Sequence, residues 1–288
     1  MKSKTILIVG GTDGIGKAIA MKAGNENSVI LVGRSIQKGK ALLKQYSNWY
    51  FYPADISEMK NVVTLLEGIS KNHSQIDYVV HTADVLLDKR VETKEGLELS
   101  VAVNIYARVL LNHLLLHKHG FKPTRIMHVA LAGAPFGQKT FMDEFPIKEH
   151  VSSAKAHMIG QIANDVYGLF LQRKLNEEVK VNILNPGMVD TDIRRNGELP
   201  MMMKVLNPIF ALLRPFIETK PNEYAEIPFS ILKGKNEIAE THVLISAKGK
   251  SVKNSKVTSN IRNQEATMSS IEKKLRDLTG LAIDLSHG

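Results

Sequence analysis

Cysteine is absent from this sequence of 288 residues. Its absence excludes a disulfide framework, a thiolate zinc site, an iron–sulfur cluster and a cysteine nucleophile. A chain without cysteine is compatible with a reducing compartment, so we expect a cytoplasmic location. The composition is nevertheless 43% apolar, which is enough for a substantial core and excludes wholesale disorder.

Long uninterrupted hydrophobic runs are also missing. The first apolar run, Ile6–Val9, is short and ends at a glycine cluster, so we expect a strand there rather than a signal peptide. The most apolar long stretch, Leu199–Ile217, contains Lys204, Arg214 and internal prolines, which make it a poor membrane span. These features predict a soluble protein.

The formal net charge of +9 is concentrated near the C-terminus. Between Lys248 and Arg276 there are eight basic and two acidic residues, and no aromatic residue occurs from Lys248 to Gly288. Binding of single-stranded nucleic acid normally uses base stacking on aromatic rings. We therefore expect a basic C-terminal extension over residues 247–288 that is solvated and partly mobile, and no nucleic-acid partner.

Short apolar runs alternate with segments of helical periodicity over most of the chain. This rhythm predicts parallel strands joined by helical crossovers, that is, a Rossmann-type doubly wound α/β sheet. We expect one such domain over residues 1–246, with a helical lid at about 192–220. The predicted strands are Ile6–Val9, Val29–Val32, Trp49–Tyr52, Ile76–Val80, Ile126–Ala130 and Val179–Leu184.

A glycine-rich turn follows the first predicted strand. Gly10, Gly14 and Gly16 have the spacing G-x-x-x-G-x-G, and a helix is predicted to begin within it. Glycine lets the backbone approach a pyrophosphate, and the free N–H groups of the helix attract an anion. A plain strand–helix turn is the alternative interpretation of the glycines alone.

The end of the second strand indicates which dinucleotide would bind. An NAD site usually places an acidic residue there, which accepts a hydrogen bond from the ribose 2′-hydroxyl. This chain has Arg34, which suits a 2′-phosphate, and Lys17 could assist it. NADP(H) is therefore favoured over NAD(H), although Arg34 could also be an ordinary solvated loop residue.

With these motifs in order, the chain resembles the short-chain dehydrogenase/reductase family, and loosely its retinol-dehydrogenase-like branch, from about residue 4 to about residue 232. Val9–Gly16 is similar to the family's TGxxxGxG and Lys180–Thr191 to its VNxxxPGxVxT, while Asp55-Ile56 and Asn104 match two further motifs. The turn and the resemblance together imply the cofactor-binding residues Gly10, Thr12, Gly14, Ile15, Gly16, Arg34, Asp55, Ile56, Ala83, Lys155, Pro186, Gly187, Val189 and Thr191.

The resemblance also implies a catalytic set, from which this chain departs. In the family, a tyrosine four residues before a lysine transfers a proton, a serine polarises the substrate oxygen, and an asparagine orders water. The segment Val151–Lys155 has the lysine but valine at the tyrosine position, and Ala130 stands at the serine position. By resemblance, Lys155 would hold the nicotinamide ribose and Asn104 would order water.

Several histidines could replace the missing proton donor. His150 lies beside the tyrosine position and is our candidate proton donor, because histidine titrates near neutral pH. His81, Asp84 and His128 also follow or end strands at the edge where open α/β sheets bind ligands. The plainer interpretation is that these are polar residues without a catalytic role, and strand alternation could turn His128 away from the cleft.

Two further features bear on partners. The methionine-rich Leu199–Ile217 lies where the family has a substrate lid and suits an apolar ligand; helix packing or weak contact with a membrane surface are alternatives. His113 and His117 share a helix face and could hold a metal, but a solvated or interface helix end is the simpler interpretation, and no metal site is expected. The resemblance also implies a homodimer.

Together these features predict an NADP(H)-binding oxidoreductase of the resembled family with an atypical active site, acting on an apolar carbonyl or hydroxyl compound. Two alternatives stay open. One is a catalytically silent protein that uses the cofactor site structurally, as a scaffold or sensor. The other is a non-redox enzyme, such as a dehydratase or cyclase, that reuses the cleft, because a fold does not determine its chemistry.

Overall fold

The computed structural model describes residues 3–134, 136–149, 151–175, 179–190 and 218–285. Within them, seven parallel strands form one sheet in the order β3-β2-β1-β4-β5-β6-β7. The order reverses direction between β1 and β4, which is the point where open α/β sheets bind ligands. The strands are β1 (Thr5–Val9), β2 (Ser28–Gly33), β3 (Trp49–Pro53), β4 (Tyr78–His81), β5 (Arg125–Val129), β6 (Lys180–Leu184) and β7 (Leu244–Ile245).

This sheet confirms the predicted Rossmann-type fold. The six predicted strands correspond to β1–β6, while the two-residue β7 at the sheet edge was not predicted. Alternation along β1 shows why its buried residues are all apolar. Ile6 and Ile8 pack into the core on one face of the sheet, and Leu7 and Val9 pack into the core on the other.

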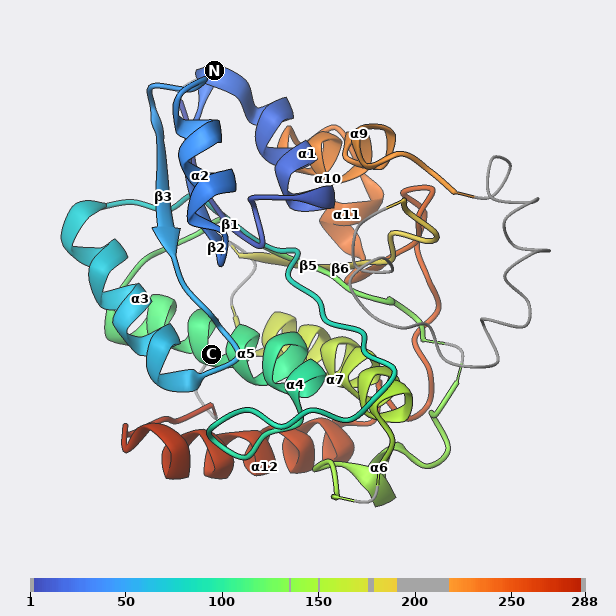
Figure 1. Ribbon diagram of the computed structural model, residues 1–288. Helices are drawn as coiled ribbons and strands as arrows, with labels where there is room; N and C mark the ends of the chain where they lie inside the picture. Colours follow the sequence, from blue (N-terminus) through green and yellow to red (C-terminus); the bar gives the residue numbers. More distant parts are fainter. Residues whose placement is uncertain (1–2, 135, 150, 176–178, 191–217, 286–288) are drawn as a thin grey trace.

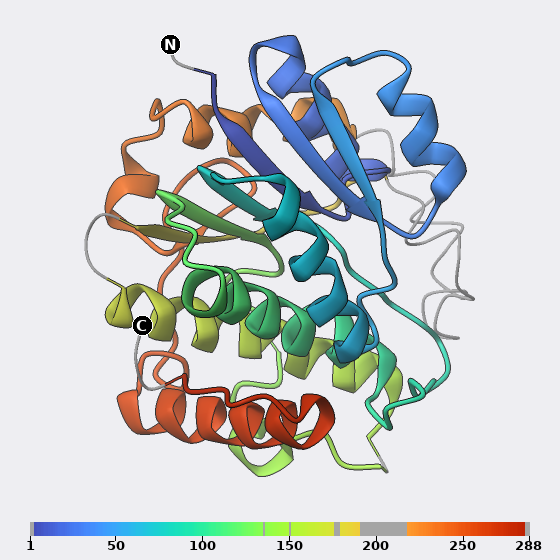
Figure 2. The same cartoon turned by 90° about the vertical axis from the view of Figure 1, so that its left-hand side faces the viewer.

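Helices cover both faces of the sheet (Figures 1 and 2). The shorter helices on one face are α1 (Gly14–Ala23), α2 (Ile36–Leu43), α9 (Pro221–Tyr224), α10 (Glu226–Leu232) and α11 (Ile238–Thr241). The opposite face carries α3 (Met59–Asn72), α4 (Leu99–Val101), α5 (Ala107–His113) and α7 (Ser153–Lys174). Two further short helices in the described part of the chain are the 3₁₀ turn η1 (Gly24–Glu26) and α6 (Phe141–Glu144).

The central helix of the second layer is continuous from Leu99 to Lys118, but two of its segments are π-helical instead of α-helical. The π-helical segments η2 (Ala102–Tyr106) and η3 (Leu114–Lys118) flank α5. In the first, the N–H of Ala107 donates to the carbonyl of Ala102, five residues back. The helix is long and apolar enough to cross a membrane by length and composition, but most of it is buried inside the protein.

The C-terminal extension contains a long helix, α12 (Ile261–Thr279), which lies outside the second helical layer (Figure 1). It packs against α3 and α7, and Met268, Ile271 and Leu275 join the core on that side. The expectation of a solvated, partly mobile extension is therefore wrong for this helix. Its apolar residues recur every three or four positions on one face, so the charged residues lie on the other.

Candidate functional site

The first part of the site is the turn between β1 and α1. The N–H groups of Gly10 and Gly11 donate to the carbonyl of Val32, at 2.9 and 3.1 Å, which folds the turn against the end of β2. Gly10 and Gly14 have positive φ angles of 89° and 49°. A Cβ on Gly16 would collide with the Gly10 carbonyl oxygen and the Thr82 hydroxyl. The glycines are thus needed where the backbone turns and where β1, α1 and the end of β4 meet.

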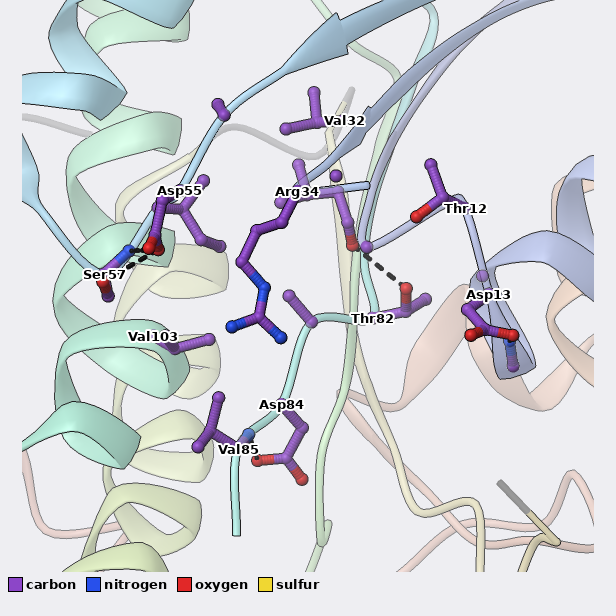
Figure 3. A pocket seen from close by; sticks show the side chains of 18 of the residues that line it. Thr12, Asp13, Val32, Arg34, Asp55, Ser57, Thr82, Asp84, Val85 and Val103 are labelled. Atoms are coloured by element: carbon purple, nitrogen blue, oxygen red, sulfur yellow. Dashed lines mark hydrogen bonds between the residues drawn. The ribbon is translucent and has the colours of Figure 1, made fainter. Parts of the chain in front are cut away.

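A pocket runs along the ends of β1 to β4 beside this turn (Figure 3). Its walls come from four consecutive βα connections, and Val103 of the central helix closes one side. The structure therefore brings together many of the cofactor residues expected from the sequence. Those lining the pocket are Gly10, Thr12, Gly14, Ile15, Gly16, Arg34, Asp55, Ile56 and Ala83.

Charged side chains line this pocket. The exposed Arg34 extends its guanidinium into it from the end of β2 (Figure 3). In the glycine turn, Asp13 caps α1 by accepting from the N–H of Gly14 at 2.9 Å and pairs with Lys38. Burial by itself would raise the pKa of Asp13, but the bonds to Lys38 and Gly14 outweigh it and lower that pKa. Asp13 is therefore ionised, and Lys38 offsets its charge.

Beyond the turn, a second pocket adjoins the first. The two share Ile15, Thr82 and Asp84. The walls of the second are mostly apolar, and it also contains Pro186, Gly187 and Val189, three residues expected from the sequence to border the nicotinamide. Its other lining residues are Leu86, Val129, Ala130, Leu131, His157 and Gln161.

A histidine–carboxylate pair lies where the two pockets meet. The Nε2 atom of His157, on α7, is 3.0 Å and 3.3 Å from the carboxylate oxygens of Asp84, which follows β4. The Gln161 amide nitrogen, one helical turn on, is 3.1 Å from the same Nε2, and its oxygen accepts from the N–H of Leu131 at 2.8 Å. Sequence reasoning considered Asp84 but missed both α7 residues; a histidine and a glutamine four apart, at the Tyr–Lys spacing, were the available signal.

The charges of Asp84 and His157 shift each other's pKa. Burial alone would raise the pKa of Asp84 and lower that of His157, but each partner's charge reverses the effect of burial on the other. The pKa of Asp84 is consequently lowered, with a further contribution from Arg108, and that of His157 is raised. The two side chains remain 24% and 15% exposed, so the pair faces the pocket rather than the closed core.

Lys155 stands apart from the pockets. It lies on the first turn of α7, its side chain is half exposed, and it forms an ion pair with Glu144 of α6. The described linings of the two adjoining pockets do not include it. Val151, at the expected tyrosine position, is buried in the core. The predicted ribose-binding role of Lys155 is thus not supported by its placement.

Other expected residues have different outcomes. Asn104 is fully buried in the π-helical segment η2, and its amide makes no hydrogen bond of standard geometry with the described residues. It is nonetheless close enough to Asp84 to contribute to the lowered pKa of that carboxyl. His150, Thr191, the methionine-rich stretch 199–217 and almost all of the expected lid at 192–220 lie outside the described residues.

Beneath the site lies a network of buried polar side chains. Arg108 of α5 donates to the carbonyls of Ala83 at 2.7 Å and Val129 at 3.0 Å, and so ties together the ends of β4 and β5. Asn112 contacts the Nε2 atoms of both His81 and His128, at 2.9 and 3.1 Å. Hydrogen bonds thus satisfy many of the polar groups whose burial would otherwise be costly.

The same network accounts for two of the candidate histidines. His81 and His128 are fully buried, and neither lines the described pockets. Burial, with the charge of Arg108 added, lowers the pKa of His81 to about 3 and that of His128 well below its usual value. Both stay neutral near pH 7, so their placement supports the plainer interpretation, a polar role without proton transfer.

Known proteins resemble this chain in sequence and fold. A family model for short chain dehydrogenases matches residues 4–133. Mouse retinol dehydrogenase 13 is 26% identical over 239 residues, an alignment covering 78% of this chain and 71% of that protein.

Two solved structures share the fold. One is a short-chain dehydrogenase/reductase from Saccharomyces cerevisiae, with a TM-score of 0.63 and 19% identity over 89% of this chain and 98% of that one. The other is the Pseudomonas aeruginosa RhlG/NADP complex, with a TM-score of 0.62 and 18% identity over 85% and 95%. Such low identities compare the folds alone. The family model, the sequence relatives and the ordered motifs around the turn all indicate one similarity: the chain resembles the short-chain dehydrogenases/reductases.

Proposed function

We propose that this protein is an NADP(H)-dependent oxidoreductase that interconverts an apolar carbonyl compound and its alcohol at an atypical active site. The observation that carries the proposal is the pair of adjoining pockets. One has a glycine turn and an arginine suited to a dinucleotide, and the other has apolar walls around an acid–base pair.

The first pocket fits the phosphates of a dinucleotide. A Cβ on Gly10, Gly11 or Gly16 would collide with neighbouring atoms, and the N-terminus of α1 supplies N–H groups for a pyrophosphate. Arg34 would bind a 2′-phosphate, and an adenine would lie near Asp55 and Ile56. The bound nicotinamide would supply or accept the hydride.

The second pocket supports an apolar substrate. Leu86, Val129, Leu131 and Val189 form most of its surface, and Ala130 contributes only a methyl group. Apolar walls with a few polar groups are typical of sites that bind hydrophobic small molecules and orient one reactive atom. The relatives named retinol dehydrogenases support the same substrate class, since retinol is an apolar alcohol.

A binding experiment tests the choice of cofactor. We expect purified protein to bind NADPH more tightly than NADH, because Arg34 can pair with the 2′-phosphate. The variant Arg34→Ala should weaken NADPH binding by about 10–100-fold, as expected for the loss of a hydrogen bond between charged groups. NADH binding should change little. Titration of cofactor fluorescence measures both.

The matched control is Arg262→Ala, which removes an exposed arginine at the start of α12, outside both pockets. Its NADPH affinity should equal that of the wild type. Equal affinity of the wild-type protein for NADH and NADPH would contradict the assignment of NADP(H).

A turnover experiment tests the reaction. NADPH oxidation should be detected with at least one member of a panel of long-chain and cyclic apolar aldehydes and ketones. Tight NADPH binding without turnover would favour the silent cofactor-binding alternative. Conversion of substrate without a change in NADPH absorbance would favour a non-redox enzyme.

A homodimer and a cytoplasmic location are predictions of the sequence that we retain in this proposal. The position of α12 constrains the first of them. This helix packs on α7, so a dimer formed through α7 would also have to accommodate α12.

A further inference from the structure

The His157–Asp84 pair occupies a distinctive position. Asp84 lines both the pocket that suits a dinucleotide and the pocket with apolar walls, while His157 lines only the second. A group at this junction would be near both the reactive end of a cofactor and the reactive atom of a substrate. Accordingly, the pair lies where a proton would have to be delivered.

The hydrogen bonds of His157 give its two ring nitrogens different roles. Its Nε2 atom faces both the Asp84 carboxylate and the Gln161 amide nitrogen. A protonated Nε2 can donate to Asp84, and an unprotonated Nε2 can accept from Gln161, but one nitrogen cannot do both at once. The Nδ1 atom makes no hydrogen bond with any residue that the structure describes. One nitrogen is therefore anchored in either protonation state, and the other is available to a ligand.

Gln161 is itself held in place. Its oxygen accepts from the N–H of Leu131, in the segment after β5, so its amide nitrogen must point toward His157. The imidazole is thus fixed between the connection after β4 and the connection after β5. Such fixation of a histidine by a carboxylate on one ring nitrogen is how proton-transferring imidazoles are oriented in enzymes.

Three charged groups on other elements act on His157. Asp84, after β4, and Glu98, at the start of α4, favour the imidazolium form, whereas Arg108 of α5 opposes it. Burial also opposes it, yet the pKa of His157 is raised above its usual value of 6.5. The raised pKa favours the imidazolium form, as a proton donor requires.

We propose that His157 is the catalytic acid and base of this oxidoreductase, with Asp84 and Gln161 as the residues that position it. The inference rests on the proposed function and names the group that transfers its proton. His157 and Gln161 are four residues apart, as are the family's tyrosine and lysine. They lie six positions after Val151 and Lys155, respectively.

The proton balance of the reaction follows. In reduction, the carbonyl carbon gains the hydride with its two electrons, and the electron pair of the broken C=O π bond moves to oxygen. That oxygen takes the proton from Nδ1 of His157, which changes from imidazolium to neutral imidazole. Solvent then returns a proton to Nδ1. In oxidation, Nδ1 accepts the hydroxyl proton as the alcohol carbon loses a hydride.

The decisive variant is His157→Gln, which keeps a side chain of similar size but cannot titrate. We expect kcat/KM for reduction to fall about 10²–10⁴-fold, the usual contribution of a positioned acid. NADPH affinity should stay near that of the wild type. The control His242→Gln removes an exposed histidine at the end of α11 and should not alter turnover.

A pH profile separates a catalytic from a merely structural role. Because the acid must be protonated, wild-type reduction should decline as pH rises through a midpoint above 6.5, and oxidation should increase through the same midpoint. His157→Gln should lose this titration. Asp84→Asn should move the midpoint to lower pH, because the carboxylate that raises the pKa of His157 is gone. Urea unfolding of each variant would show whether it is folded.

The outcomes separate this inference from the proposed function. If the wild type turns over and His157→Gln keeps its rate or its pH midpoint, His157 is not the acid, although the protein is still an oxidoreductase. If the wild type binds NADPH but oxidises it with no compound of the panel, the proposed function fails, and this inference fails with it.

Discussion

The two halves of the sheet form their parts of the site in different ways. Around β1, β2 and β3, the pocket is formed by a glycine turn, by the N-terminus of a helix and by side chains, such as Arg34, that directly follow the strands. Around β4, β5 and α7, side chains from distant segments form it, with His157 reaching Asp84 and Gln161 reaching Leu131. Phosphates can be recognised by backbone N–H groups, whereas proton transfer needs a specific side chain. The first half is consequently encoded locally and the second is not.

The buried polar side chains follow the same division. Beneath the second half, Arg108, His81, His128 and Asn112 form a polar network inside the core. The core residues of β1 are all apolar. A polar network in the core fixes side-chain positions at the cost of sensitivity to substitution, because a single removal leaves buried groups unpaired.

The largest expected effect is a loss of NADPH affinity when the glycine turn is altered. The variant Gly16→Ala places a Cβ against the Gly10 carbonyl oxygen and the Thr82 hydroxyl, so the turn must shift. We expect NADPH affinity to fall by more than about 100-fold, that is, by more than about 2.7 kcal/mol. The matched control is Gly68→Ala on α3, whose Cβ would approach only the Tyr52 ring, at 3.8 Å.

The control should leave NADPH binding unaltered and stabilise the protein by about 0.5–1 kcal/mol, because alanine favours helix more than glycine does. Isothermal titration and urea unfolding measure the two quantities. Unchanged affinity in Gly16→Ala would mean that the turn does not bind the dinucleotide.

A second prediction tests the half of the site that is formed by side chains, through the pH dependence of the protein's stability. Burial raises the pKa of Asp165, on α7, to about 7, although its carboxylate accepts from the N–H of Gly133 at 2.8 Å. The folded protein therefore binds this proton more tightly than the unfolded chain does. The resulting stability is fully present below about pH 4 and is lost as pH rises to about 7.

Asp165→Asn removes that titration and keeps an oxygen that can accept from Gly133. We compare the free energies of unfolding of the variant and of the wild type. The variant's value minus the wild-type value should rise by roughly 2–4 kcal/mol from pH 4 to pH 8. Urea unfolding at both values, with the exposed Asp143→Asn as control, measures the difference. A constant difference between variant and wild type across this range would show that Asp165 does not titrate as described.

The smallest expected effect concerns the residue on which sequence and structure differ. Lys155 is half exposed and paired with Glu144, so Lys155→Met should change stability by less than about 1 kcal/mol, as is usual for exposed ion pairs. NADPH affinity should change only a few-fold. A loss of affinity as large as that of Arg34→Ala would restore the role that the sequence predicts for Lys155.

These contrasts explain how far sequence reasoning could go. Strands β1–β6 were predictable because each is a short, mostly apolar segment between helical segments. The glycine turn and Arg34 were predictable because they follow directly from the ends of β1 and β2. The strand β7 has two residues and lacks a pattern of its own, so it could not be recognised.

His157 escaped prediction for a different reason. It lies more than 25 residues after the end of β5, beyond a connection whose length no local rule fixes. By sequence, the tyrosine and lysine positions fall at Val151 and Lys155, because that lysine follows a segment of small residues. Only the packing of α7 against the ends of β4 and β5 reveals which turn of the helix faces the pocket. Helix α12 was underestimated because its many charges masked an apolar face.

The packing of α12 also has a consequence for biosynthesis. Its apolar face covers α3 and α7, so those two helices share a core with residues that the ribosome adds some 90 to 200 positions later. Until the segment ending at Leu285 has left the ribosome, the corresponding surface of α3 and α7 is open to other apolar molecules. The sheet and its glycine turn lie before α12 in the chain, whereas the layer that carries His157 is completed only after α12 has been added.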